Sequence, residues 1–415
     1  GGYRLELLDA DEQHLYDLTS DFVQSVSTAQ AHEVFIPANL TCKDCTVRLL
    51  RQVPDFSPDF YFWSCADVTI VKKRNYRETC SGKGSSQNGH CNCQRDYWGN
   101  RCQYKDECEQ DSDCNVGGRC IYLDGTALPT KQCFCSPKYF GEKCRFPNPS
   151  SMPKAVTEID LSKHVTVPLS DRLTMYFKTK LGKTEDQDEL EFVLIANGTS
   201  FVGLGWRPTA LGPSCKNWPF DIKANEISTK VKRQAAGKPN ESTSAEYGSQ
   251  SQEGYPQDYQ DEPYLFLNEW AAHDPFTPMD CSDIIIGTAR GGLSRVRDYY
   301  ARGRHTPQID SAWGGKDDLI GATGWEVSGI TTIIFRRKAR TNDGPDHTIK
   351  DEMQLIWSRG QQPGEHVSNP YHQLEKGQTQ TSAFYVVDEL KYHGLGTQRG
   401  VLYINFTAAR NEFTK

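Results

Sequence analysis

The chain has 415 residues, 24% of them charged, and a formal net charge of -7. This length exceeds one ordinary domain, and an acidic balance without a long Lys/Arg run excludes nucleic acid as an expected partner. No stretch approaches the run of about 18 apolar residues that a membrane-spanning helix needs.

The 15 cysteines are concentrated between Cys42 and Cys144. Such density in small segments is typical of disulfide-bonded, secreted proteins. Four N-x-S/T sequons agree with a secreted glycoprotein: Asn39, Asn197, Asn240 and Asn405. Because the chain starts Gly1-Gly2-Tyr3 without a signal-peptide pattern, we expect a processed chain or a fragment of a longer precursor.

Short runs rich in β-branched and aromatic residues predict strands, whereas helical periodicity is nearly absent, so the predicted fold class is all-β. In residues 1–75 the predicted strands are 3–8, 33–37, 46–50 and 61–63. In residues 148–415 they include 173–177, 192–195, 330–335, 353–357 and 400–406. Strand-rich blocks are therefore expected on either side of residues 76–147, and the resemblances given below imply that they are two β-sandwich domains, the first one partial.

Residues 76–147 contain a repeat. The spacing C-x-C-x8-C with an aromatic-aromatic-Gly turn occurs at Cys91–Cys102 and again at Cys133–Cys144. It resembles the C-terminal half of an EGF-like module, with a short copy at 76–104 and a complete copy at 105–147. The resemblance implies the pairs Cys80–Cys91, Cys93–Cys102, Cys108–Cys120, Cys114–Cys133 and Cys135–Cys144. It does not support calcium, since Tyr104 stands where an acidic residue is needed before Cys108.

The remaining cysteines divide into two groups. Cys215 and Cys281 are predicted to bridge within the last domain, which leaves the odd set Cys42, Cys45 and Cys65. A structural disulfide is the favoured interpretation of Cys42-x-x-Cys45, because no second pair of zinc ligands is nearby. One member of the set would then have a partner in an upstream region.

Residues 34–49 and 61–70, with Cys42, Cys45 and Cys65, resemble the C-terminal part of animal chitin-active lytic polysaccharide monooxygenases. The resemblance covers about residues 30–71 and implies a partial immunoglobulin-like sandwich. Phe62 matches the axial aromatic of the copper site in that family. The two histidine ligands have no match, so the resemblance supports a structural or binding module and no copper.

Residues 225–262 are rich in Gln, Ser, Gly, Glu and Tyr, and predict a disordered insertion. Within this segment the dibasic run Lys230–Arg233 comes just before the polar stretch Ala235–Asp261, and both a solvated charge cluster and a proteolytic processing site remain open interpretations.

The last block resembles a DOMON domain. The matching residues are Gly203–Trp206, Met279–Gly287, Ile330–Lys338 and Lys391–Gly394, and the stretches 289–315 and 388–400 resemble the Skeletor and Knickkopf families of insect cuticle proteins. The resemblance implies a β-sandwich over 148–415 that binds b-type haem or sugars. Met279 and His393 fall on the axial ligand positions of the haem-binding members.

Alternatives to this ligand pair remain. Met279 could be a core residue and His393 a turn residue; His366 and His372 compete for the histidine role, and His273 could replace Met279. No hydrolase or phosphate-loop motif occurs, so no catalytic residue is predicted.

Three functions are compatible with the sequence. The first is a haem module that passes electrons to an extracellular redox partner. The second is a structural or adhesive matrix protein that self-assembles or binds other matrix proteins. The third is glycan binding on exposed aromatic platforms, for which the candidates are Trp206, Trp313 and Trp325.

Overall fold

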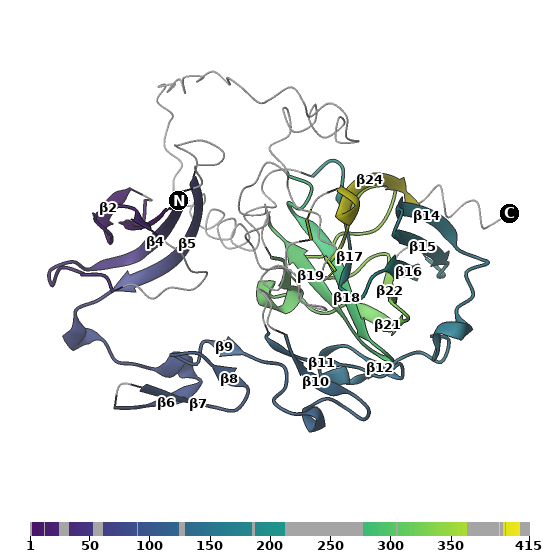
Figure 1. The fold of residues 1–415 in the computed structure, drawn as a ribbon, viewed down its shortest axis with the longest axis horizontal. Helices are drawn as coiled ribbons and strands as arrows, with labels where there is room; N and C mark the ends of the chain where they lie inside the picture. Colours follow the sequence, from purple (N-terminus) through teal and green to yellow (C-terminus); the bar gives the residue numbers. More distant parts are fainter. Residues whose placement is uncertain are drawn as a thin grey trace, which may run out of the picture. The chain divides into compact units, whose positions relative to one another are not determined.

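The computed structural model describes residues 2–11, 13–24, 33–52, 61–88, 90–123, 129–184, 187–211, 277–303, 306–362, 390, 393–394 and 396–406. The chain divides into two compact units, with the boundary between Tyr104 and Lys105. The described elements are β-strands and short 3-10 helices (Figure 1), which confirms the all-β fold class. Among these residues, no helix has the length and apolarity that crossing a membrane requires.

The first unit contains one antiparallel sheet in the order β2-β1-β4-β5, with β3 also paired to β1. Its strands are β1 (Gly2–Leu8), β2 (His14–Asp17), β3 (Val23–Gln24), β4 (Cys42–Gln52) and β5 (Tyr61–Ile70). Leu7, Leu18 and Cys45 are buried against this sheet. The Cys42–Cys45 disulfide lies at the start of β4, where the register with β5 shifts.

One predicted strand of this unit is wrong. Residues 33–37 form no strand, and Phe35 is 76% exposed. The described part of residues 1–75 is a single sheet, with no second sandwich layer among the residues that the structure describes. Phe62 lies in β5, and Cys65 on the same strand is an exposed free cysteine.

Residues 76–104 and 105–147 are held by disulfides. The first segment contains β6 (Gly84–Gln87), β7 (His90–Cys93), β8 (Tyr97–Trp98) and the start of β9 (Tyr104–Lys105). The second contains β10 (Arg119–Tyr122), β11 (Lys131–Phe134), β12 (Tyr139–Phe140) and β13 (Phe146–Pro147). Their disulfides are Cys80–Cys91, Cys93–Cys102, Cys108–Cys120, Cys114–Cys133 and Cys135–Cys144, the pairs that the EGF-like resemblance implies.

The acidic pair before Cys108 has a structural role. One oxygen of Asp106 accepts hydrogen bonds from the backbone N–H groups of Thr130 and Lys131, at 2.8 and 3.0 Å. The carboxylate of Glu107 accepts hydrogen bonds from the N–H groups of Cys133 and Lys143, at 3.2 and 2.5 Å. These carboxylates satisfy the backbone of a segment that has too few apolar residues to form a core of its own.

The second unit contains a sandwich of two antiparallel sheets. The five-stranded sheet has the order β14-β15-β16-β22-β21, and the six-stranded sheet has the order β20-β19-β18-β17-β23-β24. The strands of the first are β14 (Val165–Ser170), β15 (Leu173–Lys180), β16 (Glu189–Asn197), β22 (Ile330–Lys338) and β21 (Leu319–Val327). Those of the second are β20 (Gln308–Ile309), β19 (Leu293–Ala301), β18 (Ser282–Arg290), β17 (Val202–Pro208), β23 (Glu352–Arg359) and β24 (Arg399–Asn405).

Alternation along the strands fills the space between the two sheets. Leu204 and Trp206 of β17, Ile285 of β18 and Leu355 of β23 pack against Phe192 and Phe335 of the facing sheet. Gly287 marks a close approach of the sheets, because a Cβ there would lie 2.6 Å from the side chain of Ile333. The predicted strands of residues 148–415 lie within strands of this sandwich, except that 400–406 extends one residue past the end of β24; the predicted insertion at 225–262 lies outside the described residues.

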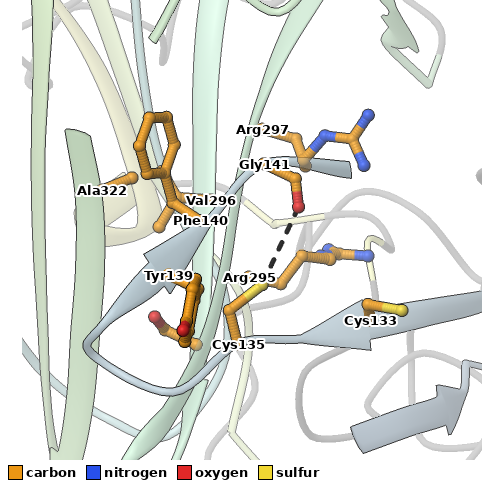
Figure 2. A pocket seen from close by; sticks show the side chains of 10 residues that line it. Cys133, Cys135, Tyr139, Phe140, Gly141, Arg295, Val296, Arg297 and Ala322 are labelled. Atoms are coloured by element: carbon orange, nitrogen blue, oxygen red, sulfur yellow. Dashed lines mark hydrogen bonds between the residues drawn. The ribbon is translucent and has the colours of Figure 1, made fainter. Parts of the chain in front are cut away.

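The module of residues 105–147 belongs to the same compact unit as the sandwich. Cys135 and Ser294 exchange two backbone hydrogen bonds of 2.7 and 3.0 Å. Phe134 is fully buried, with the guanidinium carbons of Arg290 and Arg295 5.5 and 5.8 Å from its ring centre. A gap of about 10 Å³ remains at this contact (Figure 2), which is room for one water at most and for no larger ligand.

Candidate functional site

The six-stranded sheet buries apolar residues on the side that faces away from the sandwich core. A separate cluster forms there, which we call the outer cluster: Phe201, Ile284, Ile286, Tyr299, Ala301 and Leu390, with Met279, Ile309 and Ile356 packed against it. Residues of one strand point alternately to opposite faces, so Ile284 and Ile286 lie on the outer side while Ile285 lies in the core. β18 therefore carries buried apolar residues on both of its faces, although the outer face of a sandwich sheet normally contacts water.

The centre of this face is made of glycine. Gly203 and Gly205 alternate with the core residues of β17, and β17 is paired with β18 on one side and β23 on the other. A Cβ on Gly205 would lie 2.8 Å from Ile284 and 2.9 Å from Ile356. The side chains of Ile284 and Ile356 thus close over Gly205, and the two glycines add no side chain that projects from this face, so the face is flat there.

Met279 reaches the outer cluster from a loop that is fixed by hydrogen bonds. The carboxylate of Asp280 accepts hydrogen bonds from the N–H and hydroxyl of Thr277, at 2.7 and 2.6 Å. The carbonyl of Pro278 accepts hydrogen bonds from Ser282 and Gln354, each 3.1 Å long. Cys281 is disulfide-bonded, while its predicted partner Cys215 lies outside the described residues.

His393 has the properties of a neutral metal ligand. Burial, together with the nearby charge of Arg399, lowers the pKa of His393 to about 4, so the imidazole is neutral at pH 7. Its Nδ1 lies 2.8 Å from the carbonyl oxygen of Gly394. When Nδ1 carries the proton and donates to that carbonyl, the lone pair is on Nε2, which is the arrangement of a histidine that binds a metal.

Met279 and His393 each lie before a strand of the six-stranded sheet, and the two strands run in opposite directions. Met279 precedes β18, and His393 precedes β24, which runs antiparallel to β18 because each neighbouring pair between them is antiparallel. Leu390, three residues before His393, packs in the outer cluster against which Met279 also packs. The outer cluster therefore contacts Met279 directly and includes Leu390, which is three residues from His393 in the sequence.

The sequence of this region matches a known domain family. Residues 274–360 match the DOMON domain family model. The match contains Met279 and the strands from β18 to β23, and it ends before His393.

Two solved structures are similar to the chain that carries this DOMON domain. One is the cytochrome b domain of pyranose dehydrogenase from Coprinopsis cinerea, with 10% identity, 57% of this chain and 78% of that chain covered, and a TM-score of 0.27. The other is the cytochrome domain of Myriococcum thermophilum cellobiose dehydrogenase, with 10% identity, 62% and 99% covered, and a TM-score of 0.24. A search of curated proteins found no match.

The other predicted site residues have different outcomes. His273, His366, His372, Asn240 and the run 230–233 lie outside the described residues, whereas Asn39, Asn197 and Asn405 are exposed. Trp206 and Trp325 are buried, so their prediction as exposed platforms for glycans is wrong. Trp206 is stacked on Phe192 in the core, and Trp313 is half-buried, with its indole N–H 3.3 Å from the carbonyl of Tyr300.

Sequence reasoning missed one polar group in the outer cluster. Tyr299 is fully buried, and its hydroxyl makes no hydrogen bond with any residue that the structure describes. An unpaired hydroxyl in an apolar cluster costs stability unless a bound group supplies its partner. Its position opposite Ile284 in β18, on the outer face, was the signal available from the strand pattern.

Proposed function

We propose that the DOMON domain binds one b-type haem against the outer cluster, with Met279 and His393 as axial ligands, and transfers electrons outside the cell. The observation that carries the proposal is the presence of Met279 and Leu390, the close neighbour of His393, at one apolar cluster on the outer face. Met279 and Leu390 are far apart in the sequence, and the fold brings both of them to the same cluster.

The residues of this face fit the chemistry of the group. The isoleucines and the strip of Gly203 and Gly205 offer a flat apolar surface, and the unpaired Tyr299 hydroxyl offers a hydrogen bond to a polar edge. The neutral imidazole of His393 and the thioether of Met279 are both suitable ligands. A haem iron held by this pair has no open position, and it exchanges single electrons at a potential that the thioether raises.

The disulfides support an extracellular location, since such bonds persist in oxidising compartments. An extracellular redox partner follows from the proposed electron transfer, and no catalytic residue of this chain is required for it. The burial of Trp206 and Trp325 removes two of the three aromatic platforms on which glycan binding rested.

The test is an absorption spectrum of the intact chain after reconstitution with haemin, oxidised and then reduced with dithionite. We expect a Soret band, and sharp low-spin α and β bands after reduction. Met279→Leu keeps the volume of the side chain but removes the sulfur, and His393→Gln removes the imidazole; each should abolish the low-spin spectrum.

Met152→Leu is the matched control, because Met152 packs in a different cluster of the same sandwich. It should leave the spectrum unchanged. A featureless spectrum of the reconstituted wild-type chain would refute haem binding and leave a matrix or adhesive protein. A low-spin spectrum that survives His393→Gln would refute the assignment of that ligand.

A further inference from the structure

A group of buried aspartates lies inside the sandwich, on the face of β18 opposite to the outer cluster. Asp283 of β18 and Asp298 of β19 point inward, Asp310 begins a short 3-10 helix, and Asp346 lies between β22 and β23. We call these four residues the carboxylate cluster. One oxygen each of Asp283, Asp298 and Asp346 lie within 4.8 Å of one another.

Most of these oxygens have no hydrogen-bond partner among the described residues. Asp298 and Asp310 are each 2% exposed, and no described residue donates a hydrogen bond to either oxygen of either side chain. The Oδ1 atom of Asp283 is also buried and unpaired. Buried carboxylate oxygens are normally hydrogen-bonded or bound to a metal, so these unpaired, converging oxygens are suitable ligands for a cation.

The positive charge around the cluster is too small to balance it. Arg337 is fully buried, with Nη1 2.8 Å from Asp283 and Nη2 3.2 Å from Asp346, the second contact without hydrogen-bond geometry. Its guanidinium also lies over the ring of Trp206, with 4.8 Å to the ring centre. When all four carboxylates are ionised, this one guanidinium leaves three negative charges.

Neighbouring groups do not remove this excess. Asp318 and Asp343 add negative charge at the edge of the cluster, whereas Arg207 and Arg302 lie near Tyr300 beside it. His347 is kept neutral because burial lowers its pKa, and its Nε2 lies 2.7 Å from the carbonyl of Cys281. Burial and mutual repulsion raise the pKa of Asp283 to about 8 and that of Asp310 to about 9, so both can be ionised at pH 7 only when a counter-charge is bound.

We propose that the carboxylate cluster binds one hard divalent cation, with Ca²⁺ as the expected ion. The available donors are carboxylate oxygens, with no thiolate and no histidine nitrogen turned to them among the described residues, which favours Ca²⁺ over zinc or copper. Oxygens on opposite sides of Ca²⁺ are roughly 4.6–5.2 Å apart, a span that the observed spacing matches. A divalent cation would reduce the excess from three negative charges to one.

The test measures calcium bound by the intact chain after equilibrium dialysis, together with the melting temperature in Ca²⁺ and in EDTA. We expect one Ca²⁺ per chain at this site and a higher melting temperature in Ca²⁺. Asp298→Asn keeps the shape but removes a ligand charge, so calcium affinity should fall by on the order of 100-fold or more and the melting temperature should no longer respond. Asp310→Asn gives a second, independent variant.

Two controls locate the ion. Asp171→Asn changes an exposed carboxylate of the same sandwich and should behave as the wild-type chain does. Asp106→Asn changes the carboxylate of the cysteine-rich module and should keep the calcium of the sandwich. The proposal is overturned if the wild-type chain binds no calcium and melts identically in Ca²⁺ and EDTA, if Asp298→Asn and Asp310→Asn both retain the response, or if Asp106→Asn alone removes it.

Discussion

The buried carboxylate of Glu191 predicts that the sandwich loses stability at acidic pH. It lies on β16, 7% exposed, with Oε1 3.0 Å from His164 Nε2 and 2.6 Å from Lys178 Nζ, and with Arg336 bound to the other oxygen. Burial alone would raise the pKa of Glu191, but hydrogen bonds from His164 and Lys178 and the charge of Arg336 outweigh burial and lower the pKa from 4.5 to about 2. This difference corresponds to about 3 kcal/mol of folding stability at neutral pH.

The sign of the pH dependence follows from the direction of the shift. Because the folded-state pKa of Glu191 is depressed, its contribution is present above pH 4.5 and is lost as the pH falls towards 2. Glu191→Gln removes the titrating group. We therefore expect the variant to be less stable at pH 7, and the gap to the wild-type chain to narrow by about 2 kcal/mol at pH 3.

Urea unfolding of the intact chain at pH 7, 5 and 3, followed by near-ultraviolet circular dichroism, measures this gap. Glu189→Gln is the matched control, since Glu189 on the same strand forms an exposed pair with Lys180 (3.0 Å), and surface pairs contribute little. A gap for Glu191→Gln that stays constant from pH 7 to pH 3 would refute the reasoning.

Two further predictions concern the outer face and the module contact. Gly205→Val should destabilise the chain by about 1–3 kcal/mol and reduce haem uptake, because the new Cβ would lie within 3 Å of the side chains of Ile284 and Ile356. Urea unfolding measures the loss of stability, and titration with haemin measures the haem uptake. Gly292→Ala, in open space, is the control, and unchanged haem uptake in Gly205→Val would contradict the position proposed for the haem. Phe134→Ala should lower the free energy of unfolding by about 3–5 kcal/mol, because a fully buried ring is lost. The control is Tyr122→Ala, which changes an exposed ring of the same module. Equal urea midpoints for the two variants would show that Phe134 does not hold the module to the sandwich.

The strands of the sandwich were predictable because their β-branched and aromatic residues form runs of four or more positions. Ile330–Phe335 and Phe192–Ile195 are such runs, and both lie in paired strands. Residues 33–37 have a similar local pattern but no strand partner among the described residues, and Phe35 is exposed. Strand propensity takes effect only where a neighbouring strand and a core are available.

The candidate sites were predictable to a smaller extent. Met279 and His393 could be chosen only by resemblance to a family, since no local pattern distinguishes a ligand from a buried core residue. Asp283 and Asp298 could not be recognised, because an aspartate within an apolar run gives no indication of which face its side chain occupies. β18 is apolar on both faces, so alternation alone does not tell which one meets the other sheet.

The two proposed sites share β18 but use opposite faces of it. Asp283 points into the core and Ile284 into the outer cluster, so Asp298→Asn changes charge on one side of the sheet only. The loop before β18 is the segment that connects them: Met279 packs against the outer cluster, while the carbonyl of Cys281 meets His347, whose backbone N–H donates to Asp283 at 3.2 Å. A haem spectrum that persists in Asp298→Asn would show that the two sites are independent. A changed spectrum would indicate coupling through this loop, because Met279 in the loop is four residues before Asp283 in β18.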